Sequence, residues 1–433
     1  MPLRPRIFYG WYMVAASAAI MVLSASTLYF GTGVLFSAIV GEYHWSTLAA
    51  AAAVSLRSEL SAIAAPMVGY MIDRFGTRPV MLIGLGCIAV GLLWLSQIDA
   101  IWGFYGSLAL TAIGTSGSGG AVGTIAVSRW FVRKRSRALS LMFIGPATAG
   151  ITVPVLTWLI TTHGWRTANV IWAGIIVVVC MPLALVIRDA PEKYGLRPDG
   201  DPPGQPEAAV SASARPLDQA SVLGGSRSLT VKQALRTRTF WQLMMAYTLT
   251  NMANTPAVVL AVPFLVGQGI PTETAAWAAA GIPAVSVIGR VGLGFWGDFL
   301  DKRYIVAFSF VLQAAGIFLL AGITEAWMIM PFLALFAVGF GGPIPLRTAL
   351  QADYFGLGSL GSIQGALMFM TTIGGFMGPI FLGALVDMTG TYHLGWVVLA
   401  VICALSVPLT LMMPPPLTPG RRRVADATEG KAS

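Results

Sequence analysis

Charged residues are scarce in this chain. They make up 10% of its 433 residues, whereas 56% are hydrophobic. About a quarter of the residues of a soluble globular protein are charged, so this composition excludes an ordinary soluble protein. No segment alternates apolar with polar residues, which excludes a membrane β-barrel. We therefore predict membrane-spanning helices, whose backbone groups are hydrogen-bonded within each segment.

Cysteine and histidine are also rare, with three of each. The cysteines are isolated within predicted helices, which excludes a disulfide framework and a metal site: Cys87, Cys180 and Cys403. The histidines all fall in predicted outer loops: His44, His163 and His393. A membrane enzyme would need such residues grouped inside the helices as metal ligands or nucleophiles. We therefore predict no enzyme activity, no metal and no cofactor.

Long apolar runs are abundant. A hydrocarbon core of about 30 Å needs about 20 apolar residues per helix, and the chain has twelve such runs, at roughly 11–36, 46–71, 79–97, 101–126, 138–160, 168–187, 240–266, 273–296, 304–322, 326–350, 361–386 and 394–413. The first run is too long for the apolar region of a cleavable signal peptide, so we expect it to be a helix. The fold prediction is an all-α integral membrane protein with twelve transmembrane helices.

The net charge of +9 reports topology rather than a polyanionic partner. If the N-terminus is cytoplasmic, 23 of the 27 Lys and Arg residues fall in cytoplasmic segments. Only Arg166 falls outside, and the other three lie within helices. This positive-inside bias predicts cytoplasmic N- and C-termini in a cell (inner) membrane. We expect no nucleic-acid partner.

One short stretch occurs twice. Gly69-Tyr-Met-Ile-Asp-Arg-Phe-Gly-Thr-Arg78 is followed 225 residues later by a reduced copy, Gly294–Arg303, in which Asp298 occupies the place of Asp73. We predict two pseudo-symmetric six-helix bundles, 1–187 and 239–413, joined by a cytoplasmic linker, 188–238, with a tail at 414–433. The linker is rich in Pro, Gly and Ser, so we expect it to be disordered in its middle. Repeated halves are typical of transporters that work by alternating access.

The first copy resembles the loop 2–3 signature of the major facilitator superfamily, Gly-x-x-x-Asp-Arg-x-Gly-x-Arg, at all five marked positions. Within that family, Gly10-Trp-Tyr-Met-Val14 and the Trp130–Leu139 stretch resemble signatures of the monocarboxylate porters and the oxalate/formate antiporters. The resemblance covers almost the whole chain.

The resemblance implies that the repeated stretch controls conformation. In the family, the Asp lies against a helix N-terminus of the other half, bonds with loop cations and holds a cytoplasmic gate shut. We predict a gating motif of Gly69, Asp73, Arg74, Gly76, Arg78 and Asp298, with Asp298 the weaker equivalent. A carboxylate at a helix N-terminus gains about 0.3–1 kcal/mol. The alternative is a solvated loop that only enforces topology.

Three arginines within helices are substrate candidates, because a charge at a helix centre costs at least about 2.5–3.5 kcal/mol. The resemblance implies that Arg290, on the eighth helix, binds a substrate carboxylate, and a guanidinium matches a carboxylate bidentately. A structural ion pair is the alternative. For Arg57 the two roles stay level, and for Arg347 a snorkelling or gate-pairing role is favoured over substrate contact.

Glu59 is the only acidic residue well inside a predicted helix, and it could carry a coupled proton. Two residues from Arg57, it points about 200° away on the helix. Polar residues that could complete a substrate site are Tyr29, Asn251 and Asn254, although such residues also bond between helices. The monocarboxylate porters often have an acid one turn before the helix-8 Arg, where this chain has Ser286.

The predicted function is secondary active transport of a small organic anion, a mono- or dicarboxylate, by alternating access. The transport would be proton-coupled or anion-exchanging, and the protein a monomer in the lipid bilayer. The first alternative is an exporter of hydrophobic, drug-like compounds of the same superfamily, because Gly145-Pro146 loosely resembles a drug-antiporter motif. A transporter-derived sensor is a further alternative, but residues 188–238 do not look like a folded output domain.

Overall fold

The computed structural model describes residues 8–26, 39, 42–43, 47–148, 152–200 and 229–414, and within these it does not describe the side chains of 47–59 and 153–154. The described part is helical and contains no strand. Seven helices, or eight if the bent pair α14–α15 counts as one span, are individually long and apolar enough to cross a membrane. Some of the other predicted runs are shorter or broken over their described residues, and all twelve predicted runs carry helix there.

The first bundle contains α1 (Tyr9–Ala25), α3 (Thr47–Phe75), α4 (Thr77–Leu95), α5 (Ile101–Ser118), α6 (Gly120–Trp130), α7 (Arg135–Met142), α8 (Ile144–Thr148), α9 (Val153–Ile175), a π-helical turn (Ile176–Cys180) and α10 (Met181–Val186). One predicted run is divided into α5 and α6 at Gly119, whose backbone is extended. Within α9 the chain turns at Gly164, which has φ 78°.

The second bundle contains α13 (Val231–Leu235), α14 (Arg238–Val259), α15 (Ala261–Gly267), α16 (Thr272–Trp296), α17 (Lys302–Ala321), α18 (Ile329–Gly341), α19 (Pro343–Phe355), α20 (Leu360–Thr389) and α21 (Tyr392–Leu411). The division between α18 and α19 corresponds to that between α5 and α6. The α14–α15 pair bends by 54°. Pro256, which has no N–H for the helix ladder, lies just before this bend.

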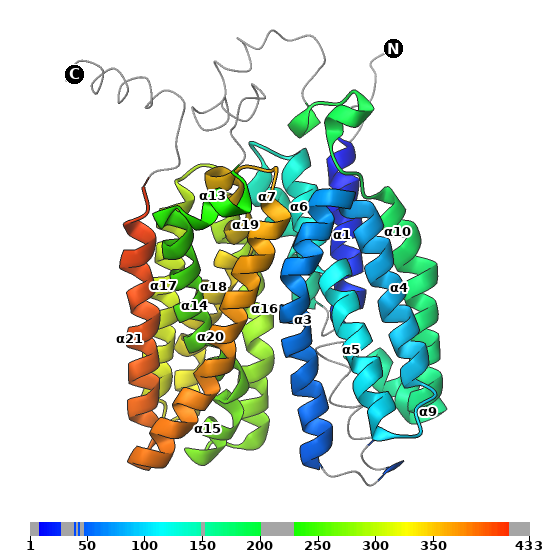
Figure 1. Ribbon diagram of the computed structural model, residues 1–433. Helices are drawn as coiled ribbons and strands as arrows, with labels where there is room; N and C mark the ends of the chain where they lie inside the picture. The colour runs from blue at the N-terminus through cyan, green and yellow to red at the C-terminus, as the bar shows by residue number, and fades with distance from the viewer. Residues whose placement is uncertain are drawn as a thin grey trace, which may run out of the picture.

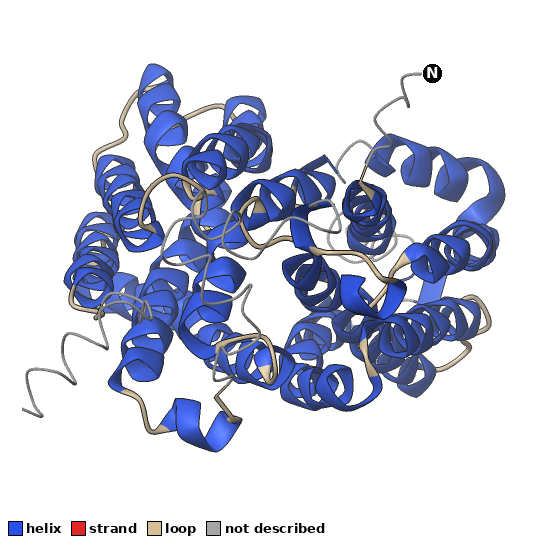
Figure 2. Cartoon of the chain, turned by 90° about the horizontal axis from the view of Figure 1, so that it is seen from above, coloured by secondary structure: helices blue, strands red, loops and turns tan. Residues whose placement is uncertain are grey.

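The two bundles stand side by side, with α3 and α16 near their boundary (Figure 1). One hydrophobic core belongs mainly to the first bundle, and two further cores belong to the second. The view along the helices separates the same two groups (Figure 2). The beginning of α1, the end of α21 and residues 188–200 lie at the same end of the molecule (Figure 1). We call this end the linker face.

The linker is structured at both described ends. Residues 188–200 contain two short 3-10 turns, and residues 229–230 lead into α13, which begins with a capping box between Thr230 and Gln233. The predicted disorder in the middle of the linker concerns residues 201–228, which lie outside the described residues, as does 415–433 of the tail.

Candidate functional site

Asp73, near the end of α3, binds the first turn of α20 in the other bundle. Its carboxylate accepts hydrogen bonds from the backbone N–H of Gly361 (3.0 Å) and of Ser362 (2.8 Å), and from the Ser362 hydroxyl (2.7 Å). The first N–H groups of a helix have no acceptor within the helix, and the helix dipole favours an anion there. This contact therefore joins the two bundles on the linker face. We call it the first latch.

Gly69 and Gly76 are both required by the geometry around Asp73. A Cβ on Gly69 would lie 2.1 Å from the carbonyl oxygen of Gly361, so α3 and α20 touch through their backbones. Gly76 has φ 89°, and a Cβ there would lie 2.7 Å from the Asp189 carboxylate. That carboxylate accepts from the N–H (2.6 Å) and the hydroxyl (2.7 Å) of Thr77, at the start of α4.

The two arginines of the motif lie outside the first latch. Arg74 is exposed, donates to the Tyr70 hydroxyl at 3.1 Å and lies over the ring of Phe75, all within its own helix. Arg78 is half-buried in the first turn of α4. The hydrogen-bond partners described for Asp73 are all neutral donors.

Asp298, after α16, binds the first turn of α7 in the first bundle. Its carboxylate accepts from the backbone N–H of Ser136 at 2.9 Å and pairs with Arg137 at 3.0 Å. The Arg137 guanidinium also lies over the rings of Phe295 and Phe299, at 4.2 and 4.5 Å. Burial raises the pKa of Asp298, although the Ser136 N–H and Arg137 act in the opposite direction. This is the second latch.

The two latches are related by the internal repeat. Asp298 follows Asp73 by 225 residues, and Gly361, a donor of the first latch, follows Ser136, a donor of the second, by the same number. Each bundle therefore contributes one carboxylate and one helix N-terminus, and the pair of contacts has the pseudo-two-fold symmetry of the sequence.

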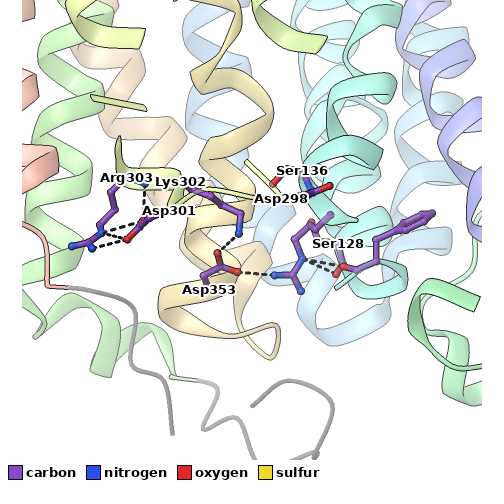
Figure 3. A network of polar contacts seen from close by, with 9 residues as sticks. Ser128, Ser136, Asp298, Asp301, Lys302, Arg303 and Asp353 are labelled. Carbon is purple, nitrogen blue, oxygen red and sulfur yellow. Dashed lines mark hydrogen bonds and ion pairs between the residues drawn. The ribbon is translucent and has the colours of Figure 1, made fainter. Parts of the chain in front are cut away.

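Asp353, near the end of α19, joins a further ion-pair network on the linker face. It pairs with Arg135 of the first bundle at 3.0 Å and with Lys302 at 2.6 Å (Figure 3). The Arg135 side chain is held by the carbonyl oxygens of Ser128 (3.2 Å) and Phe131 (3.1 Å). The sequence does not predict this network, because basic residues in cytoplasmic loops indicate topology without indicating which acid they contact. The one sequence feature that points to the network is Asp353, an acid at the end of a helix on the face that carries the basic loops.

Asp199, in the linker, binds the backbone of the segment that precedes α7. Its buried carboxylate accepts from the N–H groups of Val132 (3.1 Å), Arg133 (2.9 Å) and Lys134 (3.2 Å). Asp199 has φ 61°, a left-handed conformation that is uncommon for a residue with a Cβ. The linker thereby holds the loop that leads into the second latch. Nothing in the sequence pattern pointed to this contact.

Arg290 lies on α16 and reaches into the other bundle. It is 6% exposed, and its Nη1 donates to the carbonyl oxygen of Phe143 at 2.7 Å, at the break between α7 and α8. Its Nε is buried without a hydrogen-bond partner. Among the described side chains, no carboxylate pairs with Arg290. Ser286, one turn earlier, donates to the carbonyl of Pro283 (2.7 Å) in its own helix.

Arg347 lies on α19, within the second bundle. Its guanidinium lies 5.9 Å from the ring of Tyr247, whose hydroxyl donates to the carbonyl of Pro343 at 3.3 Å. The Nε of Arg347 is buried without a partner. A second cationic group without a carboxylate partner among the described side chains therefore lies in this bundle.

The remaining predicted substrate residues either bond to neighbouring helices or have side chains outside the described part of the structure. The Asn251 amide donates to the carbonyl of Thr371 (2.7 Å) and that of Asn254 to the Gln313 side chain (2.5 Å), so both bond between helices of the second bundle. Arg57 and Glu59 lie on α3, but their side chains are outside the described part of the structure, and Tyr29 is outside it altogether. No group of three or more His, Cys, Asp or Glu residues that could hold a metal occurs among the described residues.

Relatives of this chain are transporters. The monocarboxylate transporter 13 of Bos taurus is 27% identical over 404 residues, which cover 90% of this chain and 86% of the relative. The monocarboxylate transporter 11 of Mus musculus is 25% identical over 411 residues, covering 90% and 84%. The class G tetracycline resistance protein of Vibrio anguillarum is 24% identical over 356 residues, covering 80% and 82%.

Solved structures show the same fold. The proton:xylose symporter XylE aligns with a TM-score of 0.71 at 14% identity, over 94% of this chain and 96% of the symporter. The human organic anion transporter MFSD10 aligns with a TM-score of 0.67, also at 14% identity, over 93% and 98%. The family model described as Major Facilitator Superfamily matches residues 18–291 and 243–433. The twelve-helix prediction is confirmed, and so is the prediction of a transporter rather than an enzyme. The chain belongs to the Major Facilitator Superfamily and resembles its monocarboxylate transporter branch.

Proposed function

We propose that this transporter carries a small organic anion with at least one carboxylate, and that Arg290 binds it. The observation that carries the proposal is the state of the Arg290 guanidinium: buried, without a carboxylate partner among the described side chains, and bonded on one side only, to Phe143. A buried charge is stable only if it is paired or hydrogen-bonded. The substrate carboxylate would bind the Nε edge, with the two-point geometry that favours arginine.

Alternating access is the proposed mechanism, and the latches would control it. Both latches and the Arg135–Asp353 pair join the bundles on the linker face. The bond from Arg290 to Phe143 lies about 12 Å deeper, because Arg290 precedes Asp298 by eight residues at 1.5 Å per residue. The described conformation would thus be closed on the linker face. Opening it would break both latches and the Arg135–Asp353 pair.

The orientation of the protein is part of the proposal. The positive-inside bias supports a cytoplasmic linker face, and therefore cytoplasmic termini, in a cell membrane. We propose Glu59, on α3, as the candidate group for proton coupling, with anion exchange as the alternative. We keep Arg57, Tyr29, Asn251 and Asn254 as predicted contributors to the substrate site, and Arg74 and Arg78 as predicted members of the gating motif.

Export of drug-like compounds is the second candidate. It is favoured by the similarity to a tetracycline resistance protein. The buried groups argue for an anion instead, because Arg290 is cationic and an exporter of cations would need buried acids.

Uptake of labelled mono- and dicarboxylates into proteoliposomes, with and without a pH gradient, tests the proposal. We expect the natural protein to accumulate at least one carboxylate, and Arg290→Gln to lower the uptake rate by about 10- to 100-fold, because a charge-assisted contact is lost. Arg236→Gln, at an exposed arginine beside α13, is the matched control and should transport normally. Unchanged uptake by Arg290→Gln would remove Arg290 from the site, and the absence of any carboxylate uptake would favour the exporter.

A further inference from the structure

Arg347 has no polar partner among the described residues, although a buried guanidinium is expected to be hydrogen-bonded. Among the described residues, no hydrogen bond or ion pair involves its guanidinium, and its Nε is buried. The ring of Tyr247, 5.9 Å away, is its one described electrostatic contact. An aromatic face attracts a cation but cannot accept the five N–H bonds that a guanidinium offers. The unused N–H groups of Arg347 call for an acceptor that is not part of the described chain.

Gln351 repeats the same feature one turn further along α19. It is 0% exposed, and both its side-chain oxygen and its side-chain nitrogen lack a hydrogen-bond partner. Residues four apart share a face of a helix, so Gln351 lies on the face of Arg347. Buried polar groups are nearly always hydrogen-bonded, and an exception calls for a ligand, water or ion. Two successive turns of α19 therefore present unused donors on one face.

The acid nearest in sequence is not available to neutralise Arg347. Asp353 is already paired with Arg135 and Lys302. It lies six residues beyond Arg347, which places it about 240° around the helix. With Arg290, the second bundle thus holds two arginines with a buried Nε that no carboxylate neutralises among the described side chains. A single carboxylate would leave one of these charges unneutralised.

Packing of α16 against the end of α18 and the start of α19 gives the spacing of the two arginines along the bundle. A Cβ on Gly341 would lie 2.8 Å from the backbone nitrogen of Arg290, so these residues lie at one level. Arg347 is six residues further toward the linker face, about 9 Å at 1.5 Å per residue. A Cβ on Gly294 would lie 3.5 Å from Pro345, and this pair gives the same offset. Long arginine side chains can close this distance around a ligand whose two acidic groups are separated by a short carbon chain.

We infer that the substrate is a dicarboxylate, with one carboxylate on Arg290 and the other on Arg347, and with the Gln351 amide donating to the second carboxylate. This inference rests on the proposed function and narrows it, because a transporter of monocarboxylates would not need Arg347. Arg290 then serves any carboxylate, whereas Arg347 discriminates between one acidic group and two.

Uptake kinetics for malonate, succinate and glutarate, each against propionate and butyrate at pH 7, test the inference in proteoliposomes. Both carboxyl groups of the diacids are ionised at this pH. We expect KM for the best dicarboxylate to be about tenfold below that for the monocarboxylates. Arg347→Gln should raise the dicarboxylate KM by about 10- to 100-fold and change the monocarboxylate KM by less than about threefold. Arg290→Gln should impair both.

Two further variants keep the test decisive if Arg347→Gln does not fold. Arg347→Lys keeps the charge without the planar fork and should retain part of the dicarboxylate preference. Gln351→Leu should raise only the dicarboxylate KM, and Arg236→Gln should change neither. Monocarboxylates carried as well as dicarboxylates, or equal KM changes for both in Arg347→Gln, would overturn the inference while leaving the proposed function intact. Uptake of neither class by the natural protein would overturn the proposed function itself.

Discussion

The two latches have the same backbone geometry and different electrostatics. Asp73 is bound by neutral donors, namely two backbone N–H groups and one hydroxyl. The Asp298 carboxylate is bound by one backbone N–H and by a cation, Arg137, so it forms a buried ion pair. The helix N-terminus is thus the feature common to both repeats, whereas the charge around it differs. Removing one partner of a buried ion pair is costly, because it leaves the other charge buried and unpaired. Among its described partners, the first latch contains no such cation to lose.

The largest effect should come from removing the cation of the second latch. Arg137→Gln leaves the Asp298 charge buried and unpaired, and we expect the closed linker face to lose about 2 kcal/mol, or about 30-fold in population. Spin labels at Phe75 and Tyr304, both exposed and in different bundles, report the opening as a longer distance. The background lacks the three native cysteines, and Arg236→Gln is the control. An unchanged distance distribution would mean that Arg137 does not hold this face shut.

The next effect concerns the helix starts that follow the two aspartates. Gly76 precedes α4 with φ 89°, whereas its repeat equivalent Asp301 precedes α17 with φ −64° and caps it through the N–H of Arg303. Gly76→Ala forces a Cβ to a positive φ and against Asp189, which should cost about 1–2 kcal/mol. Thermal unfolding in detergent measures this loss. Gly267→Ala, where a Cβ meets open space, should leave the melting temperature unchanged.

A smaller effect is expected at the first latch. Asp73→Asn keeps the shape of the side chain and removes its charge from the α20 N-terminus, so the closed linker face should lose about 1 kcal/mol, roughly fivefold in population. The same spin-label pair measures it. Asp387→Asn, an exposed change near the other end of α20, is the control. Equal closed populations in Asp73→Asn and Asp387→Asn would show that the Asp73 charge does not stabilise the closed linker face.

The smallest effect is a pH dependence carried by the second latch. Burial raises the pKa of Asp298 in the closed state, and a solvated Asp298 in the open state would titrate near its ordinary value of about 3.9. The closed state therefore holds this proton more tightly. As the pH falls from 7 toward about 4, the closed population should rise by a few-fold, and this gain should be lost as the pH rises again. Asp298→Asn should remove this part of the dependence. A rise of the same size in Asp298→Asn would assign it to another group.

Sequence reasoning predicted the parts of the molecule that repeat and missed those that depend on packing. Apolar runs predicted the helices, because membrane thickness sets their length. The family resemblance of its motif implied that Asp73 lies at a helix start of the other bundle. The ion-pair partners of Asp353 and the backbone partners of Asp199 did not follow from the sequence, because they are brought together by tertiary structure across 51 to 218 residues. The bonds of Asn251 and Asn254 required the neighbouring helices for the same reason.

The contact of Asp199 with the N–H groups before α7 also determines where this polypeptide can be cut. A chain ending at Val186 would contain every helix of the first bundle but would lack the carboxylate that binds Val132, Arg133 and Lys134. A chain ending after Gly200 would retain it. Two separately synthesised fragments should therefore reassemble into an active transporter when the break lies within 201–228, and poorly when it lies between 187 and 198.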